Sequence, residues 1–154
     1  MTLRPGKRSG GPWYGEDSRR LLFEREAARH FPCLHGTNNK SGPSAGRLYH
    51  VTIRPPHYDN RRVQILFPKK SPKVARVMAD GSEESPHRYP KGHLCMWDPK
   101  GPVEERWVFE DGLVPLLGLI IVHLFHEGWW RETGNWLGPQ AGHPKRSPDE
   151  EQPQ

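Results

Sequence analysis

The sequence predicts an α+β domain: an N-terminal helix, then an antiparallel strand meander, then a long C-terminal helix. Three observations predict it. Residues 17–30 form an amphipathic segment, three short segments between 47 and 79 are typical of strands, two of them with alternating apolar and polar residues, and a strongly apolar segment begins at 113. The links between the three strand segments are too short for crossover helices, so we expect the strands to pair antiparallel.

The first helix is expected over residues 17–30, after a Gly- and Pro-rich basic segment. Residues 1–16 should form a flexible basic arm, because a polar chain of this kind has little apolar surface to bury. Within the helix, Leu21, Leu22 and Ala28 are expected to place an apolar stripe on one face. That face should pack on the strands that follow.

Three strands are expected after a loop at 36–46, where "GTNNKSGPSAG" has loop composition. The segments are "RLYHVTIR" (47–54), "RVQILF" (62–67) and "SPKVARVMA" (71–79). Alternation in the first two places one set of side chains on the buried face: Tyr49, Val51, Ile53, Val63, Ile65 and Phe67. The link between these two strands suits a hairpin.

Residues 81–112 have little regular pattern, and long irregular segments inside compact domains are usually functional. A helix is expected over 113–132. Its apolar run at 113–125 is expected to be too short for a bilayer and to form a buried core helix. A disordered tail is expected at 143–154, so the folded domain should span 17–142.

The length of 154 residues suits a single domain with one core. The net charge is +5, but Lys and Arg are interspersed with acidic residues, so we expect no nucleic-acid partner. We see no phosphate-binding glycine loop, and we expect no cofactor. With no secretory leader and only two cysteines, we expect a cytoplasmic protein with reduced thiols and no membrane association.

Cys95 is the candidate nucleophile. It lies in "KGHLCMWDP" (91–99), inside the irregular segment and not on an apolar stripe. Nucleophilic cysteines need partial exposure and nearby positive or hydrogen-bonding groups. Such groups are close in sequence: His87, Arg88, Lys91 and His93. The alternative is a small buried apolar residue, which is the commoner role of a free cysteine.

Two metal hypotheses can be weighed against this interpretation. "CLH" (33–35) and "HLC" (93–95) offer two thiolates and two imidazoles, but structural zinc sites separate paired ligands by two to four residues, not one. Cys33 therefore fits packing at the helix end better, and we expect no metal site.

The second metal hypothesis concerns "HLFHEGWW" (123–130), which resembles a zinc-protease motif only in part. The H-E-x-x-H pattern would need a histidine at position 130, where the chain has Trp130. His123 and His126 share one helical face and are expected to be hydrogen-bonded interior groups.

Several segments, in their order along the chain, resemble the ubiquitin-conjugating enzyme (UBC-like) family over about residues 18–135. "LFPKKSPKV" (66–74) is similar to the family's third strand, and His87-Arg88-Tyr89 occupies the place of its His-Pro-Asn signature. "GHLCM" (92–96) is similar to its active-site cysteine context, followed by Trp107 and a helix from 113. The resemblance implies a UBC-like fold in which Cys95 carries a protein C-terminus as a thioester.

The resemblance also implies roles for the neighbours of Cys95. His87 would shape the active-site loop. Tyr89 stands in place of the family's asparagine, which stabilises the oxyanion during aminolysis, so Tyr89 or His93 would be the donor. Apart from the resemblance, the position of Asp98 three residues after the cysteine suggests that it orients or deprotonates the incoming amine, the alternative being a solvated loop aspartate.

The short C-terminal part resembles bacterial members encoded in CBASS anti-phage operons. The function predicted in this way is transfer of a protein C-terminus to an acceptor lysine. The expected protein substrate is a cGAS-like nucleotidyltransferase or a ubiquitin-like protein. The alternative is a catalytically inactive UBC-like or RWD-like interaction module, which the substitution of Tyr89 for asparagine favours.

Overall fold

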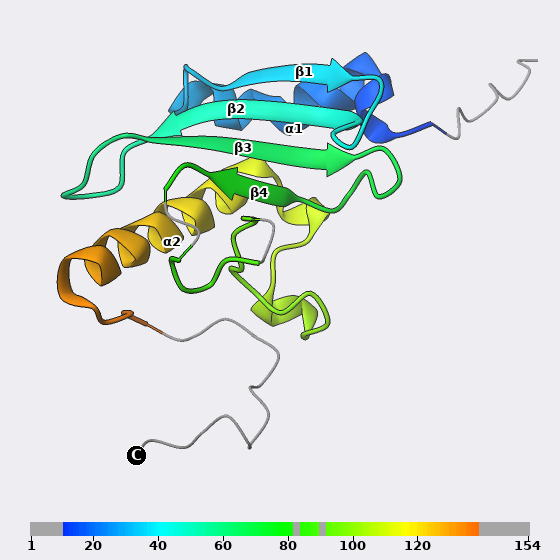
Figure 1. Cartoon of the computed structure of the whole chain (residues 1–154). Coiled ribbons are helices and arrows are strands. Elements are labelled where there is room, and N and C mark those ends of the chain that lie inside the picture. Colours follow the sequence, from blue (N-terminus) through cyan, green and yellow to red (C-terminus); the bar gives the residue numbers. More distant parts are fainter. Residues whose placement is uncertain (1–10, 82–83, 90–91, 139–154) are drawn as a thin grey trace, which may run out of the picture.

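A computed structural model describes residues 11–81, 84–89 and 92–138. Two α-helices and four strands form an α+β fold, with three short 3-10 helices (Figure 1). The elements in chain order are η1 (Trp13–Gly15), α1 (Asp17–His30), β1 (His35–Asn39), β2 (Gly46–Ile53), β3 (Arg61–Pro68), β4 (Arg76–Ala79), η2 (Val103–Glu105), η3 (Phe109–Asp111) and α2 (Leu113–Thr133). The predicted α+β class and the order of helix, meander and long helix are confirmed.

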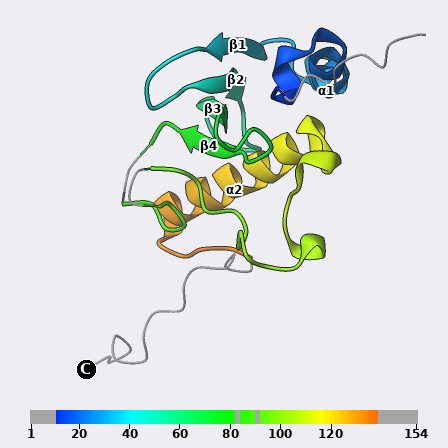
Figure 2. The same ribbon diagram turned by 90° about the vertical axis from the view of Figure 1, so that its right-hand side faces the viewer.

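The four strands form one antiparallel meander in the order β1-β2-β3-β4. Both helices cover the same side of this sheet, as the turned view shows (Figure 2). The alternation predicted for β2 and β3 is confirmed, because the side chains facing the helices are the buried ones: Tyr49, Val51, Ile53, Val63, Ile65 and Phe67. The core therefore lies between the sheet and the helices, and the other side of the sheet is left open.

The prediction of a loop over all of 36–46 is wrong, because β1 occupies its first part. β1 pairs with β2 from His35 opposite His50 to Asn39 opposite Gly46. Four of its five residues are exposed, so it contributes little to the core and has no apolar alternation to reveal it. Its backbone pairing with a neighbouring strand creates the element, and this pairing is not visible in local composition.

The predicted third strand is shorter than expected. β4 begins at Arg76, because the residues before it form turns: the N–H of Ser71 donates to the carbonyl of Pro68, and that of Val74 to Ser71. The chain therefore meets β3 only over four residues. This short strand leaves room beside the sheet edge for the irregular segment that follows.

The apolar stripe predicted for the first helix is on the wrong face. Leu22 is 69 % exposed, and Leu21 and Ala28 are exposed as well. The inward face instead carries Ala27, which is fully buried, and Glu24, whose carboxylate accepts hydrogen bonds from Arg47 (2.5 Å) and from the Tyr49 hydroxyl (2.7 Å). Because the inward face of the helix includes the acidic Glu24, its residues do not form an apolar pattern in the sequence.

The expected flexible arm of residues 1–16 ends earlier than predicted. Trp13 is 2 % exposed and packs with its ring centroid 4.7 Å from Phe23, 5.2 Å from Phe109 and 5.4 Å from Phe67. Its indole N–H donates to the carbonyl of Pro72. Trp13 and Tyr14 are thus part of the core. Residues 1–10 of the expected arm and the expected tail at 143–154 lie outside the described residues.

Helix α2 confirms the predicted long C-terminal helix. It ends where Gly134 adopts a left-handed conformation (φ 78°) and donates its N–H to the carbonyl of Trp130. The helix continues two turns beyond the apolar run at 113–125, and the whole of α2 is long and apolar enough to cross a membrane by length and composition. Core helices of soluble proteins meet the same criterion, and α2 buries one face, from Leu113 to Gly128, as predicted for a core helix.

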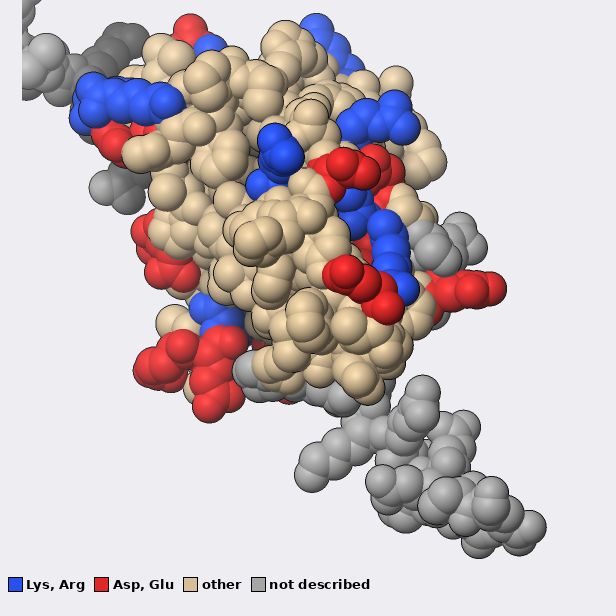
Figure 3. Space-filling view, turned by 90° about the vertical axis from the view of Figure 1, so that its left-hand side faces the viewer, with Lys and Arg blue, Asp and Glu red and all other residues tan. Residues whose placement is uncertain are grey.

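The surface seen from the left of Figure 1 carries charges of both signs (Figure 3). Basic and acidic side chains lie beside one another around a broad area without charge. This face therefore presents no continuous basic stripe of the kind that follows a nucleic-acid backbone.

Candidate active site

Cys95 lies on a narrow loop fastened to the edge of the sheet. Three backbone N–H groups hold this loop by donating to carbonyls across it or on β4: Leu94 to Val77 (2.8 Å), Cys95 to His87 (2.7 Å) and Tyr89 to His93 (2.8 Å). The backbone on both sides of the cysteine is therefore fixed. A site built on such a loop keeps its geometry without being part of a regular strand.

The loop bends sharply at His87. This residue has a φ of 59°, in the left-handed region that few residues other than glycine adopt. Its carbonyl accepts the N–H of Cys95, and its ring lies 4.3 Å from the ring of Trp136, which follows α2. Backbone conformations of this kind cost about 1–3 kcal/mol and cluster at functional sites.

Cys95 lines a cleft of about 210 Å³ between the loop and α2. The loop contributes His87 and Met96 to the wall, and α2 contributes two aliphatic side chains as well as His123 and His126. Cys95 itself is only 1 % exposed. The expectation of a partly exposed cysteine is therefore wrong, and Cys95 adjoins solvent-sized space at this cleft.

Tyr89 is the side chain whose hydroxyl is hydrogen-bonded to the Cys95 thiol. Burial of the ring, this hydrogen bond and the negative charge of nearby Asp98 raise the pKa of Tyr89 to about 12. The hydroxyl therefore stays protonated at neutral pH, and its O–H can donate a hydrogen bond to the Cys95 sulfur. Of the residues proposed from the sequence to assist Cys95, Tyr89 shares a side-chain hydrogen bond with it.

His93 and Asp98 are placed differently. His93 forms an isolated bridge with Met78 and does not line the cleft. Asp98 is exposed, and its Oδ1 accepts the N–H of Lys100 (2.9 Å), so the carboxylate caps its own turn. This arrangement favours the solvated loop aspartate over an aspartate held against an incoming amine.

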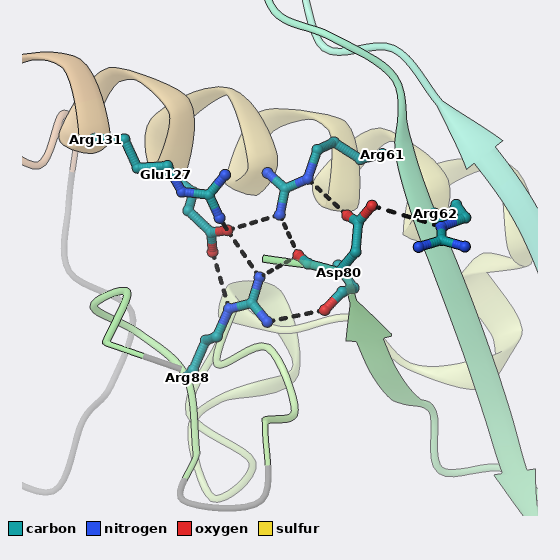
Figure 4. A network of polar contacts seen from close by, with 7 residues as sticks. Arg61, Arg62, Asp80, Arg88, Glu127 and Arg131 are labelled. Atoms are coloured by element: carbon teal, nitrogen blue, oxygen red, sulfur yellow. Dashed lines mark hydrogen bonds and ion pairs between the residues drawn. The ribbon is translucent and has the colours of Figure 1, made fainter. Parts of the chain in front are cut away.

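Arg88 does not support Cys95, although the two are close in sequence. Its guanidinium donates to both carboxylate oxygens of Glu127, at 2.8 and 3.1 Å, and to the carbonyls of Ala79 and Asp80 (Figure 4). The cation is thus committed to α2 and to the end of β4. Lys91, the other nearby cation, lies outside the described residues.

Glu127 is the centre of this network. It is fully buried, and its Oε1 also accepts hydrogen bonds from Arg61 (2.8 Å) and Arg131 (2.7 Å) (Figure 4). Burial alone would raise the pKa of Glu127, but the hydrogen bonds from Arg88 and Arg61 outweigh it, so the pKa is lowered. The carboxylate is ionised and joins α2 to β3 and to the active-site loop.

His123 approaches Cys95 from α2, one turn before Glu127. It is 6 % exposed, and its Nε2 has no hydrogen-bond partner among the described residues. Burial lowers the pKa of His123 to about 4; the Glu127 carboxylate opposes this effect, and the neighbouring His87, Arg88 and His126 add to it. The imidazole is therefore neutral at neutral pH. The prediction that His123 lies in the interior is confirmed. The prediction that it is hydrogen-bonded is wrong for Nε2, which has no partner among the described residues.

The residues of the first metal hypothesis are not gathered into a site. Cys33 is exposed and its thiol lies 3.5 Å from the carbonyl of Thr52, so the packing role predicted for it is wrong. Both described cysteines are free thiols. Within 11–81, 84–89 and 92–138, no group of three His, Cys, Asp or Glu side chains could hold a metal ion.

The sequence analysis did not anticipate the contribution of α2 and of Trp136 to the cleft. Neither could be predicted locally, because they reach the loop only through the fold. One signal was present: Glu127 occupies a buried position of a helical stripe that is apolar except for His123, and a buried carboxylate requires partners.

The sequence matches the family model of the Type II CBASS E2 protein over residues 25–144. This range covers the four strands, α2, the second part of α1 and the loop that carries Cys95. No curated protein and no solved structure matches the chain. A match that covers most of the chain, including the whole cleft, shows that the protein belongs to the Type II CBASS E2 family.

Proposed function

We propose that this protein is a cysteine-dependent transferase with a ubiquitin-conjugating fold, and that Cys95 carries the C-terminus of another protein as a thioester. Its family consists of E2-like proteins of bacterial antiviral defence. The observation that carries the proposal is the position of Cys95 at a cleft, on a fixed loop, with the Tyr89 hydroxyl on its sulfur. A purely structural cysteine would need neither the cleft nor the hydroxyl.

The chemistry has two steps. The Cys95 thiolate attacks the carbonyl carbon of an activated C-terminus, a new C–S bond forms, and the bond to the previous carrier breaks. An acceptor lysine amine then attacks the thioester carbon, a C–N bond forms, the C–S bond breaks, and Cys95 leaves as the thiolate. The proton lost by the amine passes to solvent. In the resting protein Tyr89 donates to the sulfur, and the same hydrogen bond would stabilise the departing thiolate.

The shape of the cleft favours a narrow protein end. The cleft that Cys95 lines holds about 210 Å³ of space between the loop and α2, which suits a flexible tail ending in glycine better than a bulky residue. We propose that the tail belongs to a cGAS-like nucleotidyltransferase or to a ubiquitin-like protein. The expected setting is the cytoplasm, where thiols stay reduced.

One observation favours the second candidate function, a catalytically inactive RWD-like interaction module. Cys95 is 1 % exposed, which is low for a nucleophile, and no asparagine stands at position 89. In this case the loop would present a docking surface, and the thiol would be a packing residue. The two candidates differ in whether a covalent adduct forms.

The test is expression with the neighbouring genes and comparison of reduced and non-reduced gels for wild type, Cys95→Ala and Cys95→Ser. The expected result is a higher-mass band in wild type that a reducing agent removes and that Cys95→Ala lacks. Cys95→Ser should hold the same cargo as an ester that resists reduction. Absence of any adduct with every neighbour combination would refute the transferase and support the module.

A further inference from the structure

Aminolysis of a thioester passes through a tetrahedral intermediate whose oxygen carries negative charge and needs a hydrogen-bond donor. Neither residue considered for this task from the sequence is well placed for it. The Tyr89 hydroxyl is engaged with the sulfur, and His93 does not line the cleft. The donor must therefore come from another part of the cleft wall.

The part of the wall formed by α2 offers a polar atom without a partner. His123 lines the cleft together with Cys95 and is more than nine-tenths buried, yet its Nε2 makes no hydrogen bond to the described residues. Glu127, one turn further along α2, does not serve it: the carboxylate accepts hydrogen bonds from Arg61, Arg88 and Arg131 and none from His123. An unsatisfied buried nitrogen is costly and rare, and it requires an explanation.

The protonation state of His123 suits a donor and not a base. Burial keeps the imidazole neutral at neutral pH, since its pKa is lowered to about 4. A neutral imidazole carries one N–H, and such groups act as hydrogen-bond donors to developing oxyanions in other enzymes. A base of this weakness would do little to deprotonate an amine.

We propose that His123 is the oxyanion donor of this active site, with its proton on Nε2 directed into the cleft beside Cys95. The assignment rests on the proposed function. When the amine attacks, the carbonyl π electrons move to oxygen, and the oxygen accepts the Nε2–H hydrogen bond without taking the proton. Collapse of the intermediate restores the carbonyl and expels the Cys95 thiolate.

The other histidines of the cleft fit this role less well. The ring of His87 packs more closely against Trp136 than that of His123 does, at 4.3 Å against 5.2 Å, and the carbonyl of His87 holds the Cys95 N–H. His126 is only half-buried and packs against Gly138 at the edge of the cleft. Burial and an unpaired nitrogen occur together only in His123 among the described histidines.

The experiment loads the full chain with a short peptide thioester ending in glycine and then adds free lysine. The variants are His123→Leu, which removes the donor, and His123→Gln, which restores an N–H of similar reach. His50→Leu, on the open face of β2, is the matched control. Mass spectrometry measures the Cys95 adduct at equilibrium and the rate constant for its discharge. Thermal midpoints check folding.

His123→Leu should reach the wild-type level of adduct, because an oxyanion donor lowers barriers and leaves the exchange equilibrium unchanged. Its discharge should slow by about 10²- to 10³-fold, with partial recovery in His123→Gln. Its thermal midpoint should stay equal or rise, because an unpaired buried nitrogen is removed. His50→Leu should discharge at the wild-type rate.

Two failures are distinguishable. If wild type forms no adduct while remaining folded, the proposed function is refuted, and the role of His123 falls with it. If adduct forms and His123→Leu discharges at the wild-type rate, only the assignment of His123 is overturned. Nitrogen NMR of His123 provides an independent test: a resting tautomer with the proton on Nδ1 would also overturn the assignment.

Discussion

Replacing Glu127 by glutamine should destabilise the protein more than any single surface substitution. The carboxylate is fully buried and neutralises three guanidinium groups, of which Arg61 and Arg88 have side chains only 9 % and 3 % exposed. Glutamine keeps the shape and one acceptor oxygen but removes the charge. The arginines then repel one another at short range, with Asp80 as the remaining carboxylate in the network of Figure 4.

The expected magnitude follows from the burial of the pair. Removing one partner of a buried ion pair costs about 3–5 kcal/mol, a large share of the roughly 5–15 kcal/mol by which a typical domain is stable. At roughly 2–4 °C per kcal/mol for a chain of this size, the melting temperature should fall by roughly 6–20 °C.

The assay is chemical denaturation followed by tryptophan fluorescence, with a thermal scan beside it. Glu132→Gln is the matched control, because Glu132 lies on the same helix and, among the described residues, accepts a single hydrogen bond, from the exposed Tyr58 hydroxyl (2.7 Å). Its loss should cost about 1 kcal/mol or less. Equal destabilisation by Glu127→Gln and Glu132→Gln would refute the inference that the buried charge of Glu127 stabilises the arginines around it.

Three further predictions concern pH and packing. Since burial lowers the pKa of His123 from 6.5 to about 4, the unfolded state binds a proton that the native state does not between these values. Stability should therefore be full above pH 6.5 and fall by about 3 kcal/mol as the pH drops to 4, and urea titrations of His123→Leu should lack this loss. Trp13→Ala should cost about 3–5 kcal/mol in the same titrations, whereas an N-terminal segment without core contacts predicts almost no change. Gly128→Ala should destabilise the protein by about 1–3 kcal/mol, because the added Cβ would lie 2.7 Å from the Tyr58 ring. Gly118→Ala is the control, since Gly118 faces open space on the same helix, and it should stabilise the protein by up to about 1 kcal/mol. An increase in stability in both variants would show that the Tyr58 side chain moves aside at no cost.

The parts of the fold that the sequence predicts are those whose burial alternates locally. Tyr49, Val51 and Ile53 reveal their strand because every second side chain enters the core. β1 has no such pattern, and its existence depends on pairing with β2. On α1 the buried face includes Glu24, which pairs with Arg47. The hydropathy pattern therefore predicted a buried face through Leu22, which is exposed. These failures share one cause, which is that polar groups satisfied by distant partners behave as core residues.

The site shows the same division. The loop around Cys95 could be identified from its irregular composition and its motif, and its neighbour Tyr89 does contact the thiol. The opposing wall could not, because His123 and Trp136 belong to a segment that is remote in sequence and reaches the loop only after folding. Proximity in sequence also misled, since Arg88 lies close to the cysteine in the chain but directs its charge into the network around Glu127.

Helix α2 connects these two observations. Glu127 holds Arg88, and Arg88 lies directly between His87, which bends the loop, and Tyr89, whose hydroxyl reaches the thiol. One turn earlier, the same helix places His123 in the opposite wall of the cleft. A single rigid element therefore sets both the position of the loop and the position of the donor that faces it, so the buried ion pair determines the separation of the two halves of the active site. Loss of the Glu127 charge should for this reason slow discharge of the thioester even at temperatures where the variant remains folded. A folded Glu127→Gln protein that discharges at the wild-type rate would show that the loop keeps its position without the ion pair to α2.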